Sequence, residues 1–271
     1  FITIASKGNS ADFGDSTSIR QYPGGGSSSV RGVISGGNTP SSTIQTIDYV
    51  TMSSSGNATV FGDLTLARHS PAGASSKTRT VFAGGYTDES DSNTDVNNMD
   101  YITIASTGNA QDFGDLSDEK YQNVACSNAT RGIIFGGRTQ PDGTNNVIDF
   151  VTIATLGNAT DFGDNTTTQT SAGVSSPTRA VKAGGRISPA DFNIIEYVEI
   201  ATTGNAQDFG DLLNGAKSGT SMSDRTRGVL QLGGVTSNIL EYVTFAQTGN
   251  SVDFGDMITG GNAGSGFSSS T

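Results

Sequence analysis

The 271-residue chain has no tryptophan, one cysteine, one histidine and no long apolar run, and only 15% of its residues are charged. The single cysteine, Cys126, excludes a disulfide within the chain and is expected to be a small buried thiol. The single histidine, His69, leaves zinc sites, copper sites and Ser-His-Asp or Cys-His pairs without the partners that they need. No run approaches the ~20 apolar residues that span a bilayer. The sequence therefore predicts a protein that is not an enzyme, needs no cofactor and does not insert into a membrane.

Glycine and small polar residues dominate instead. The 37 glycines and the many serines, threonines and asparagines disfavour helices and favour short strands joined by tight turns. The net charge is -11, but 11 of the 26 acids belong to one repeated motif, DFGD or VFGD, and 5 belong to a second, IDY or IEY and their variants. The remaining 10 acids face 15 basic residues that form no contiguous patch. We therefore expect an all-β protein with no nucleic-acid partner.

The sequence repeats itself with a period of 45 to 52 residues. One landmark is an FGD motif, whose phenylalanines are Phe13, Phe61, Phe113, Phe162, Phe209 and Phe254. A second is an apolar stretch closed by two glycines, such as TRTVFAGG from Thr78. A third alternates apolar and polar residues before a Gly-Asn turn, as in MDYITI from Met99, which is typical of a strand. The four strands predicted for the second full unit are residues 68–75, 78–84, 99–105 and 110–116.

Four antiparallel strands in every ~40 to 50 residues indicate the blades of a β-propeller. Within a unit, an arginine after the fourth strand, a di-glycine, a tyrosine or phenylalanine and a further large aromatic follow in a fixed order, as Arg68, Gly84, Tyr101 and Phe113 do. This order resembles the kelch repeat over essentially the whole chain, with the FGD phenylalanine where kelch repeats usually have tryptophan. The resemblance implies a propeller and no particular activity.

The two ends of the chain match different strands of the unit. The chain starts with FITIAS, which matches the third strand, and ends with GNAGSGFSSST, which matches the first strand. We therefore expect residues 1–271 to form a single propeller of six blades, whose last blade is shared between the two ends and lacks one strand. The alternative is a longer parent with seven blades. A chain that begins at Phe1 is also expected to be a fragment of a longer one.

The repeated charged residues are predicted to be structural. Six copies of FGD at blade spacing, without a Gly-rich loop or an HRD motif, do not fit kinase sites, and their phenylalanines are expected to pack between blades. The arginines before each di-glycine recur as regularly as the DFGD carboxylates, which predicts Arg–Asp pairs. These pairs would involve Arg31, Arg79, Arg131, Arg179 and Arg227 with Asp15, Asp63, Asp115, Asp164 and Asp211.

The connections between strands divide into a uniform set and a varied set, which are expected to lie on opposite faces of the ring. The turns from first to second strand and from third to fourth are near-identical in all units, whereas the other connections vary in length and chemistry. Varied loops on a rigid scaffold usually carry recognition residues, although these long side chains could instead cover strand ends. The residues predicted to bind a ligand, for which sugars or acidic glycans are suited, are Arg20, Tyr22, Arg68, His69, Tyr86, Lys120, Tyr121, Arg138, Arg186 and Lys217.

One acidic loop of the second unit is a calcium candidate. Asp88, Glu89, Asp91 and Asp95 offer the oxygen ligands that calcium requires. The alternative is a solvated acidic loop.

The sequence of the repeat, with GNATDFGD and IDFVTIA, resembles that of kelch-like proteins of marine tailed phages. In those phages the kelch-like proteins are virion or tail-fibre components. The resemblance implies a virion or extracellular location, other virion proteins as partners, and a host-surface glycan or protein as the ligand. Two alternatives are a passive structural domain of a larger virion protein and a carbohydrate-active enzyme that uses paired carboxylates.

Overall fold

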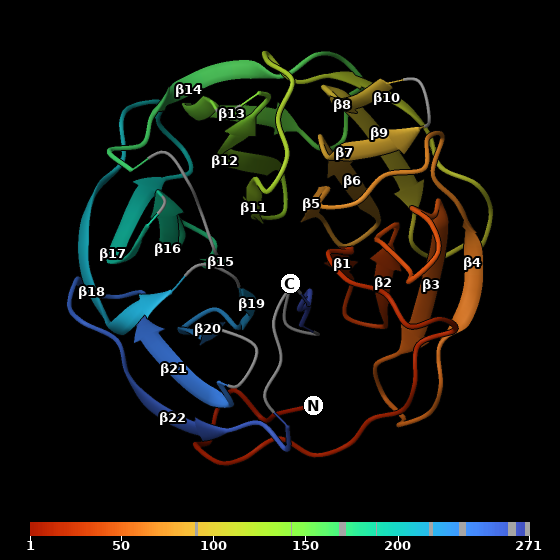
Figure 1. Ribbon diagram of the computed structural model, residues 1–271. Coiled ribbons are helices and arrows are strands. Elements are labelled where there is room, and N and C mark those ends of the chain that lie inside the picture. The colour runs from red at the N-terminus through yellow and green to blue at the C-terminus, as the bar shows by residue number, and fades with distance from the viewer. Residues whose placement is uncertain are drawn as a thin grey trace.

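Alternating apolar and polar residues in each unit produce the predicted strands. The structure, a computed structural model, describes residues 1–89, 92–141, 143–167, 172–187, 189–216, 219–232, 237–259 and 264–268. Five four-stranded antiparallel sheets are arranged around a central axis as the blades of a β-propeller (Figure 1). The described ranges contain strands and turns and no helix. The expected all-β propeller is confirmed.

The strands of each blade are ordered from the axis outward along the chain. Blade 1 consists of β1 (Gly24–Ser27), β2 (Arg31–Ser35), β3 (Thr46–Thr51) and β4 (Thr59–Asp63). Blade 2 consists of β5 (Ala72–Ser75), β6 (Arg79–Ala83), β9 (Asn98–Thr103) and β10 (Gln111–Asp115). Blade 3 consists of β11 (Val124–Ser127), β12 (Arg131–Thr139), β13 (Gly143–Thr152) and β14 (Thr160–Asp164). Blade 4 consists of β15 (Ala172–Ser175), β16 (Arg179–Ile187), β17 (Ala190–Glu199) and β18 (Gln207–Ala216). Blade 5 consists of β19 (Gly219–Ser223), β20 (Arg227–Leu232), β21 (Ile239–Thr244) and β22 (Val252–Asp256).

Blade 2 departs from its predicted strands in two respects. A separate two-stranded hairpin, β7 (Tyr86–Glu89) with β8 (Ser92–Asp95), lies between β6 and β9 in the sequence and was not predicted. The first strand begins at Ala72 and not at residue 68, because the chain turns at Ser70, whose φ is 57°.

The number of blades also departs from the prediction. The described residues form five four-stranded blades, so the predicted count of six is wrong. The two end segments that were expected to share a blade, residues 1–15 and 264–268, form no strand. They lie between blade 5 and blade 1, because Arg227 donates to the carbonyl of Ala5 at 3.4 Å and Ser27 donates to the carbonyl of Ser268 at 2.8 Å. We call this region the terminal sector.

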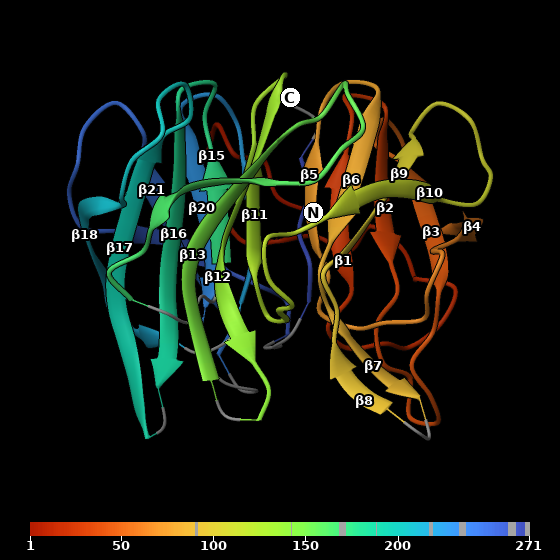
Figure 2. The same cartoon turned by 90° about the horizontal axis from the view of Figure 1, so that it is seen from above.

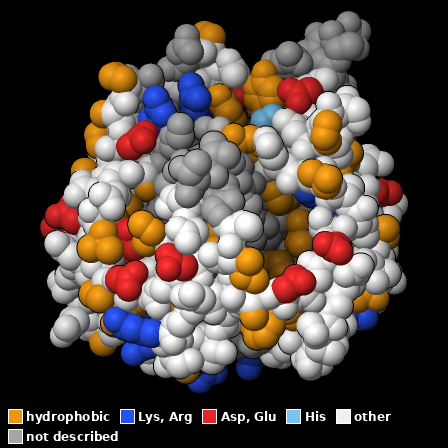
Figure 3. All heavy atoms as spheres, turned by 60° about the horizontal axis from the view of Figure 1, so that its bottom comes forward, with side chains coloured by type: hydrophobic (Ala, Val, Ile, Leu, Met, Phe, Trp, Pro, Cys, Tyr) orange, Lys and Arg blue, Asp and Glu red, His pale blue; other side chains and the backbone are white. Residues whose placement is uncertain are grey.

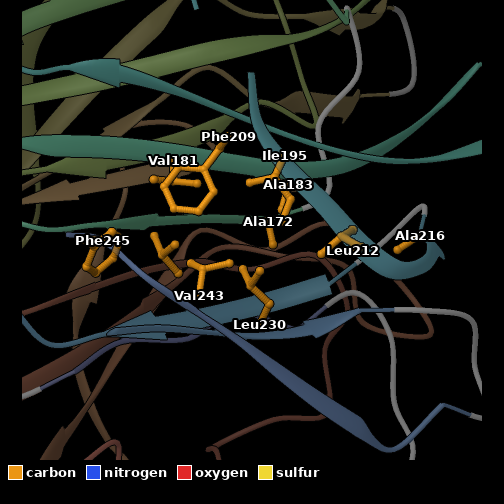
Figure 4. Close-up of a cluster of buried hydrophobic side chains, with 11 residues drawn as sticks. Ala172, Val181, Ala183, Ile195, Phe209, Leu212, Ala216, Leu230, Val243 and Phe245 are labelled. Atoms are coloured by element: carbon orange, nitrogen blue, oxygen red, sulfur yellow. The ribbon is translucent and has the colours of Figure 1, made fainter. Parts of the chain in front are cut away.

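Apolar side chains pack between neighbouring blades. Between blades 4 and 5, Phe209 and Ile195 belong to one cluster with Leu230 and Val243 (Figure 4). Five of the six FGD phenylalanines are at most 3% exposed, and full burial of such a side chain contributes ~1.5–3 kcal/mol. Their rings meet the third-strand aromatics edge to face, as Phe209 meets Tyr197 with 5.8 Å between centroids. The predicted packing role of these phenylalanines is confirmed.

The Gly-Asn turn of each unit binds the FGD segment of the preceding unit. The N–H of Gly56 donates to the carbonyl of Phe13 at 2.7 Å, and the N–H of Asp15 donates to Oδ1 of Asn57 at 3.0 Å. Both bonds recur from unit to unit, and the N-terminal turn repeats them with β22. We call this series the outer belt. It joins all five blades and the terminal sector into a closed ring.

The arginines predicted to pair with DFGD carboxylates make other contacts. Nη1 of Arg79 donates to the carbonyl of Ile153 in the next blade at 2.9 Å, and its guanidinium lies 4.3 Å from the ring centroid of Tyr101. The same two contacts are made by Arg31, Arg131, Arg179 and Arg227. The predicted Arg–Asp pairs are therefore wrong, because an aromatic ring and backbone carbonyls satisfy each guanidinium while the outer belt uses the aspartate backbone.

Candidate functional site

Three residues predicted to bind a ligand are buried in ion pairs. Each follows an FGD motif and pairs with the acid of the third strand in its own blade; the pairs are Arg20–Asp48, Arg68–Asp100 and Lys120–Asp149, at 2.5, 3.1 and 2.6 Å. All six side chains are at most 3% exposed. These cations are therefore structural and do not reach a surface ligand, which corrects the prediction.

Blade 4 forms the same kind of pair with a cation from another position. Gln169 stands in the sequence where the other blades have their cation, and Lys182 of β16 pairs instead with Glu196 of β17 at 2.7 Å. Burial favours a raised pKa for Glu196, but Lys182 and the hydroxyls of Thr166 and Thr167 outweigh it, so the pKa is lowered. The exchange keeps a cation beside the buried carboxylate of blade 4. In blade 5 the equivalent acid, Glu241, instead accepts from the hydroxyl of Ser251 at 2.6 Å and from the N–H of Leu213 at 3.2 Å.

The uniform and varied connections lie on opposite faces, as predicted. Figure 2 shows the β7–β8 hairpin and the ends of the long β12–β13 and β16–β17 hairpins on one side, which we call the loop face. The turns on the opposite face are alike: in each turn from first to second strand, a side-chain oxygen accepts from the N–H three residues later, as Ser76 does from Arg79 at 3.2 Å. Chemical variety is therefore concentrated on the loop face.

A backbone bridge recurs on the loop face with different side chains in each blade. The bridged pairs are Gln21 with Asn38, His69 with Tyr86, and Tyr121 with Arg138. Both N–H groups of the second pair donate to the opposite carbonyls, at 3.0 and 2.9 Å. The residue that follows the first member of each pair, Tyr22, Ser70 or Gln122, has a positive φ of 56°, 57° or 51°. The backbone is thus the same in three blades while the displayed side chains differ.

Four aromatic side chains form a continuous row across blades 1 to 3. Ring centroids lie 6.0 Å apart for Tyr22 and His69, 5.3 Å for His69 and Tyr86, and 5.2 Å for Tyr86 and Tyr121. The guanidinium of Arg138 extends this row, 5.7 Å from the Tyr121 ring. We call the four rings the aromatic row. In Figure 3, hydrophobic side chains in orange adjoin the single histidine, in pale blue, at the surface.

The row combines apolar rings with a small number of polar groups. Oδ2 of Asp88 lies 3.9 Å from Nε2 of His69 and accepts from the hydroxyl of Thr43 at 2.6 Å, and the Asp88 side chain is 41% exposed. Burial lowers the pKa of His69 by more than Asp88 raises it, so the imidazole is neutral at pH ~7. Asp88 was predicted as a calcium ligand and as one of the varied loop residues, but no pattern in the sequence indicated that the β7–β8 hairpin would bring it to His69.

Of the two remaining predicted residues, the structure describes one, and it lies away from the row. Arg186 lies on the β16–β17 hairpin of blade 4, where its Nε is 3.6 Å from Oδ1 of Asp191. Lys217 lies outside the described residues. Five of the ten predicted ligand-binding residues therefore lie in the row or next to it, which are Tyr22, His69, Tyr86, Tyr121 and Arg138.

The calcium candidate gains no support from the described part of its loop. Asp91 and the side chain of Glu89 lie outside the described residues, while Asp95 accepts from the N–H of Gln140 at 2.5 Å and Asp88 accepts from Thr43. Across the described ranges, no three His, Cys, Asp or Glu side chains are grouped to hold a metal ion.

The partly buried imidazole of His69 predicts a pH effect on stability. Because the folded-state pKa of His69 lies below its ordinary value of 6.5, the unfolded chain takes up the proton first as the pH falls, and stability contributed by the neutral imidazole is lost. We expect the Tm to fall as the pH drops through about 6.5, the ordinary pKa of histidine, and we expect a smaller fall in the variant His69→Gln. Gln21 at the equivalent position in blade 1 makes this a matched variant. Identical pH profiles of Tm for the two chains would contradict the prediction.

The axial cavity is a second candidate. It measures about 520 Å³ and is lined by the inner strands of all five blades and by residues 264–268. Its serines bond to neighbouring inner strands: Ser127 donates to the carbonyl of Ser75 at 2.8 Å, and Ser175 to that of Ser127 at 2.9 Å. Cys126 donates to Val174, and burial raises the pKa of its thiol to about 12. Because these groups already hold the scaffold together, the aromatic row is the stronger candidate.

Comparison with known proteins establishes the fold alone. No family description matches the chain, and no curated protein sequence matches it. Among solved structures, 343 chains match this fold. One of them, entitled "Structure of YjhT", has a TM-score of 0.73 and 9% sequence identity, with 93% of this chain and 88% of that chain covered. At this identity the likeness supports a propeller and carries no function.

In the described part of the chain, no helix is long and apolar enough to cross a membrane.

Proposed function

We propose that the protein is a non-enzymatic binding module that holds a glycan through the aromatic row of its loop face. The observation that carries this proposal is the continuous row of Tyr22, His69, Tyr86 and Tyr121, with ring centroids 5.2 to 6.0 Å apart. Tyr22, His69 and Tyr86 are partly exposed, and tilted rings at this spacing offer apolar surface to the C–H faces of consecutive sugar rings. Tyr121 is only 9% exposed and supports the ring of Tyr86.

The polar groups at the row suit the hydroxyls of a sugar. The half-exposed carboxylate of Asp88 accepts hydrogen bonds, and Arg138 donates them at the other end of the row. The neutral imidazole of His69 adds no charge at pH ~7. A neutral or singly acidic oligosaccharide therefore fits better than a polyanion.

The positions of these side chains are also suited to recognition. The row lies at backbone bridges whose geometry is shared by blades 1 to 3 while their side chains differ. A rigid backbone lowers the entropy that binding must offset, which favours affinity from few contacts.

Replacing Tyr86 by alanine should weaken glycan binding by about five- to thirtyfold, which corresponds to about 1–2 kcal/mol for a central contact residue. Tyr86 is the appropriate target because it contacts both His69 and Tyr121. A glycan array would select an oligosaccharide, and calorimetric titration would compare the two chains. Phe1→Ala is the control, because Phe1 is 59% exposed and lies in the terminal sector.

Two results would count against the proposal. If no glycan on the array binds, and the chain instead associates tightly with another structural protein, the alternative of a passive structural domain is favoured. Cleavage of a bound oligosaccharide would favour the alternative of a carbohydrate-active enzyme. We also propose that the repeat is a kelch repeat and that the protein belongs to a phage virion. Both proposals are supported by the resemblance of the repeat sequence alone.

A further inference from the structure

The carboxylate of Asp88 is an uncompensated negative charge beside the aromatic row. Tyr86 and Asp88 are two residues apart in β7, so their side chains lie on the same face of the strand. Oδ2 of Asp88 lies 3.9 Å from Nε2 of His69, and 41% of the Asp88 side chain is exposed. Because His69 is neutral at pH ~7, its imidazole does not offset this charge. The row therefore has a solvent-exposed carboxylate next to its aromatic rings.

The hydrogen bonds of Asp88 within the protein leave most of its acceptor capacity unused. The Thr43 hydroxyl lies 2.6 Å from Oδ2 of Asp88 and 2.7 Å from Oδ1 of Asn38, and its single hydrogen is donated to only one of them at a time. An ionised carboxylate has about four acceptor positions. A bound group with two or three donors therefore finds acceptors at Asp88.

The basic residues predicted for the loop face do not offset this carboxylate. Arg20, Arg68 and Lys120 are buried in ion pairs with acids of their own blades. Arg138 lies at the other end of the row, 5.7 Å from the ring centroid of Tyr121. The negative charge of Asp88 is thus available to a ligand on blades 1 and 2.

Arg138 is itself accompanied by two acids. Burial and the nearby Glu119 raise the pKa of Asp95, whereas the N–H of Gln140 and the charge of Arg138 lower it, and the net shift is upward. Together with Asp88, three carboxylates accompany one guanidinium along the row. The row is therefore acidic, which favours a positively charged ligand.

We propose that the glycan bound at the aromatic row contains an amino sugar with a free ammonium group, and that Asp88 binds this group beside the rings of His69 and Tyr86. This inference rests on the proposed glycan-binding function and names the class of sugar. The ammonium group donates hydrogen bonds to the carboxylate, while the C–H face of the same sugar packs on the ring of Tyr86. An ammonium group has three donors and a positive charge, so it satisfies Asp88 more completely than a hydroxyl does.

The length of the row favours an amino sugar over the ammonium group of a lysine side chain. The partly exposed rings of Tyr22, His69 and Tyr86 extend from blade 1 to blade 2, with centroids 6.0 and 5.3 Å apart. A lysine side chain brings its charge on a flexible four-carbon stem and covers little of this surface. An amino sugar within an oligosaccharide holds its ammonium group at a fixed position relative to its own apolar face and to the next sugar.

Two matched oligosaccharides test the inference with the full chain. A glucosamine oligosaccharide and its N-acetylated counterpart of the same length and linkage differ in the charge of one group on each sugar. At low salt, and at a pH at which the amine is protonated, calorimetric titration should give a dissociation constant about fivefold lower for the free amine. This preference should shrink at about 0.3 M salt, because the exposed Asp88 carboxylate is screened by ions.

A protein variant assigns the preference to Asp88. Asp88→Asn removes the charge and keeps the size of the side chain, so we expect the two oligosaccharides to bind it about equally well. Asp191→Asn is the matched control, because Asp191 lies on the β16–β17 hairpin of the loop face with 36% of its side chain exposed. It removes the same charge away from the row and should keep the preference for the free amine.

Four results would overturn the inference. If the N-acetylated form binds as tightly as the free amine and Tyr86→Ala weakens both, the proposed glycan site stands without an amino sugar. An undiminished preference in Asp88→Asn would place the ammonium group elsewhere. An oligolysine peptide that binds as tightly as the glucosamine oligosaccharide would make a cationic peptide the occupant. If neither glucosamine nor galactosamine oligosaccharides bind, the inference fails, and the glycan array then decides the proposed function separately.

Discussion

Replacing Arg68 by alanine should lower the free energy of unfolding by about 3–5 kcal/mol, because it leaves the Asp100 carboxylate buried without its cation. Both side chains are 0% exposed, and Nη2 of Arg68 lies 3.1 Å from Oδ2 of Asp100. Arg68 also donates to the carbonyl of Phe82 at 3.2 Å, which adds one unsatisfied acceptor on truncation. Urea unfolding followed by circular dichroism measures the loss.

A double variant separates the charge from the packing. Arg68→Met with Asp100→Leu removes both charges and keeps apolar volume, so we expect it to recover most of the stability lost by Arg68→Ala. Arg186→Ala is the matched single control, since its pair with Asp191 is about one-third exposed on both sides and an exposed pair contributes ~0–1 kcal/mol. Equal small losses in Arg68→Ala and Arg186→Ala would contradict a stabilising role for the buried pairs.

Gly163→Ala should destabilise the chain by about 3 kcal/mol or more through the outer belt. An added Cβ would lie 2.5 Å from both the carbonyl carbon and the oxygen of Gly204, and the φ of Gly163 is +148°, which L-residues rarely adopt. Backbone strain and forced separation of the belt each cost ~1–3 kcal/mol, so their sum sets the expected loss.

The partner glycine provides the control for this effect. A Cβ added to Gly204 meets nothing within 4 Å, although its φ is +158°. Gly204→Ala therefore reports backbone strain alone, and we expect a smaller shift of the urea midpoint than for Gly163→Ala. Equal shifts in the two variants would show that the close approach in the belt carries no cost.

The repeat made the fold predictable, but it did not reveal the partners of the repeated residues. Alternation and turn spacing located the strands and the two faces, since both depend on local sequence. The DFGD aspartates and the second-strand arginines recur together, yet the aspartate N–H binds an asparagine 39 to 46 residues later within the chain, as Asp63 binds Asn109. Which repeated groups contact one another depends on how one blade packs against the next. All repeated groups share the same period, so the period cannot show which of them are partners.

The ion pairs could have been predicted from one irregularity in the repeat. Units with a basic residue five positions after FGD also have IDY or MDY or IDF, whereas the unit with Gln169 has Glu196 and a lysine, Lys182, in its second strand. This exchange indicates a buried pair. The aromatic row gave no comparable signal, because it joins positions of three blades and depends on the unpredicted β7–β8 hairpin.

We propose that the loop face, and not the uniform face, binds the ligand. Hydrogen–deuterium exchange with an array-selected oligosaccharide tests it most directly, because exchange locates protection along the chain. We predict protection on binding around Tyr22, His69 to Ser70, Tyr86 to Asp88 and Tyr121, with no change at the Gly-Asn turns such as Gly108 and Asn109. Protection confined to the Gly-Asn turns, with the aromatic row unchanged, would contradict the account.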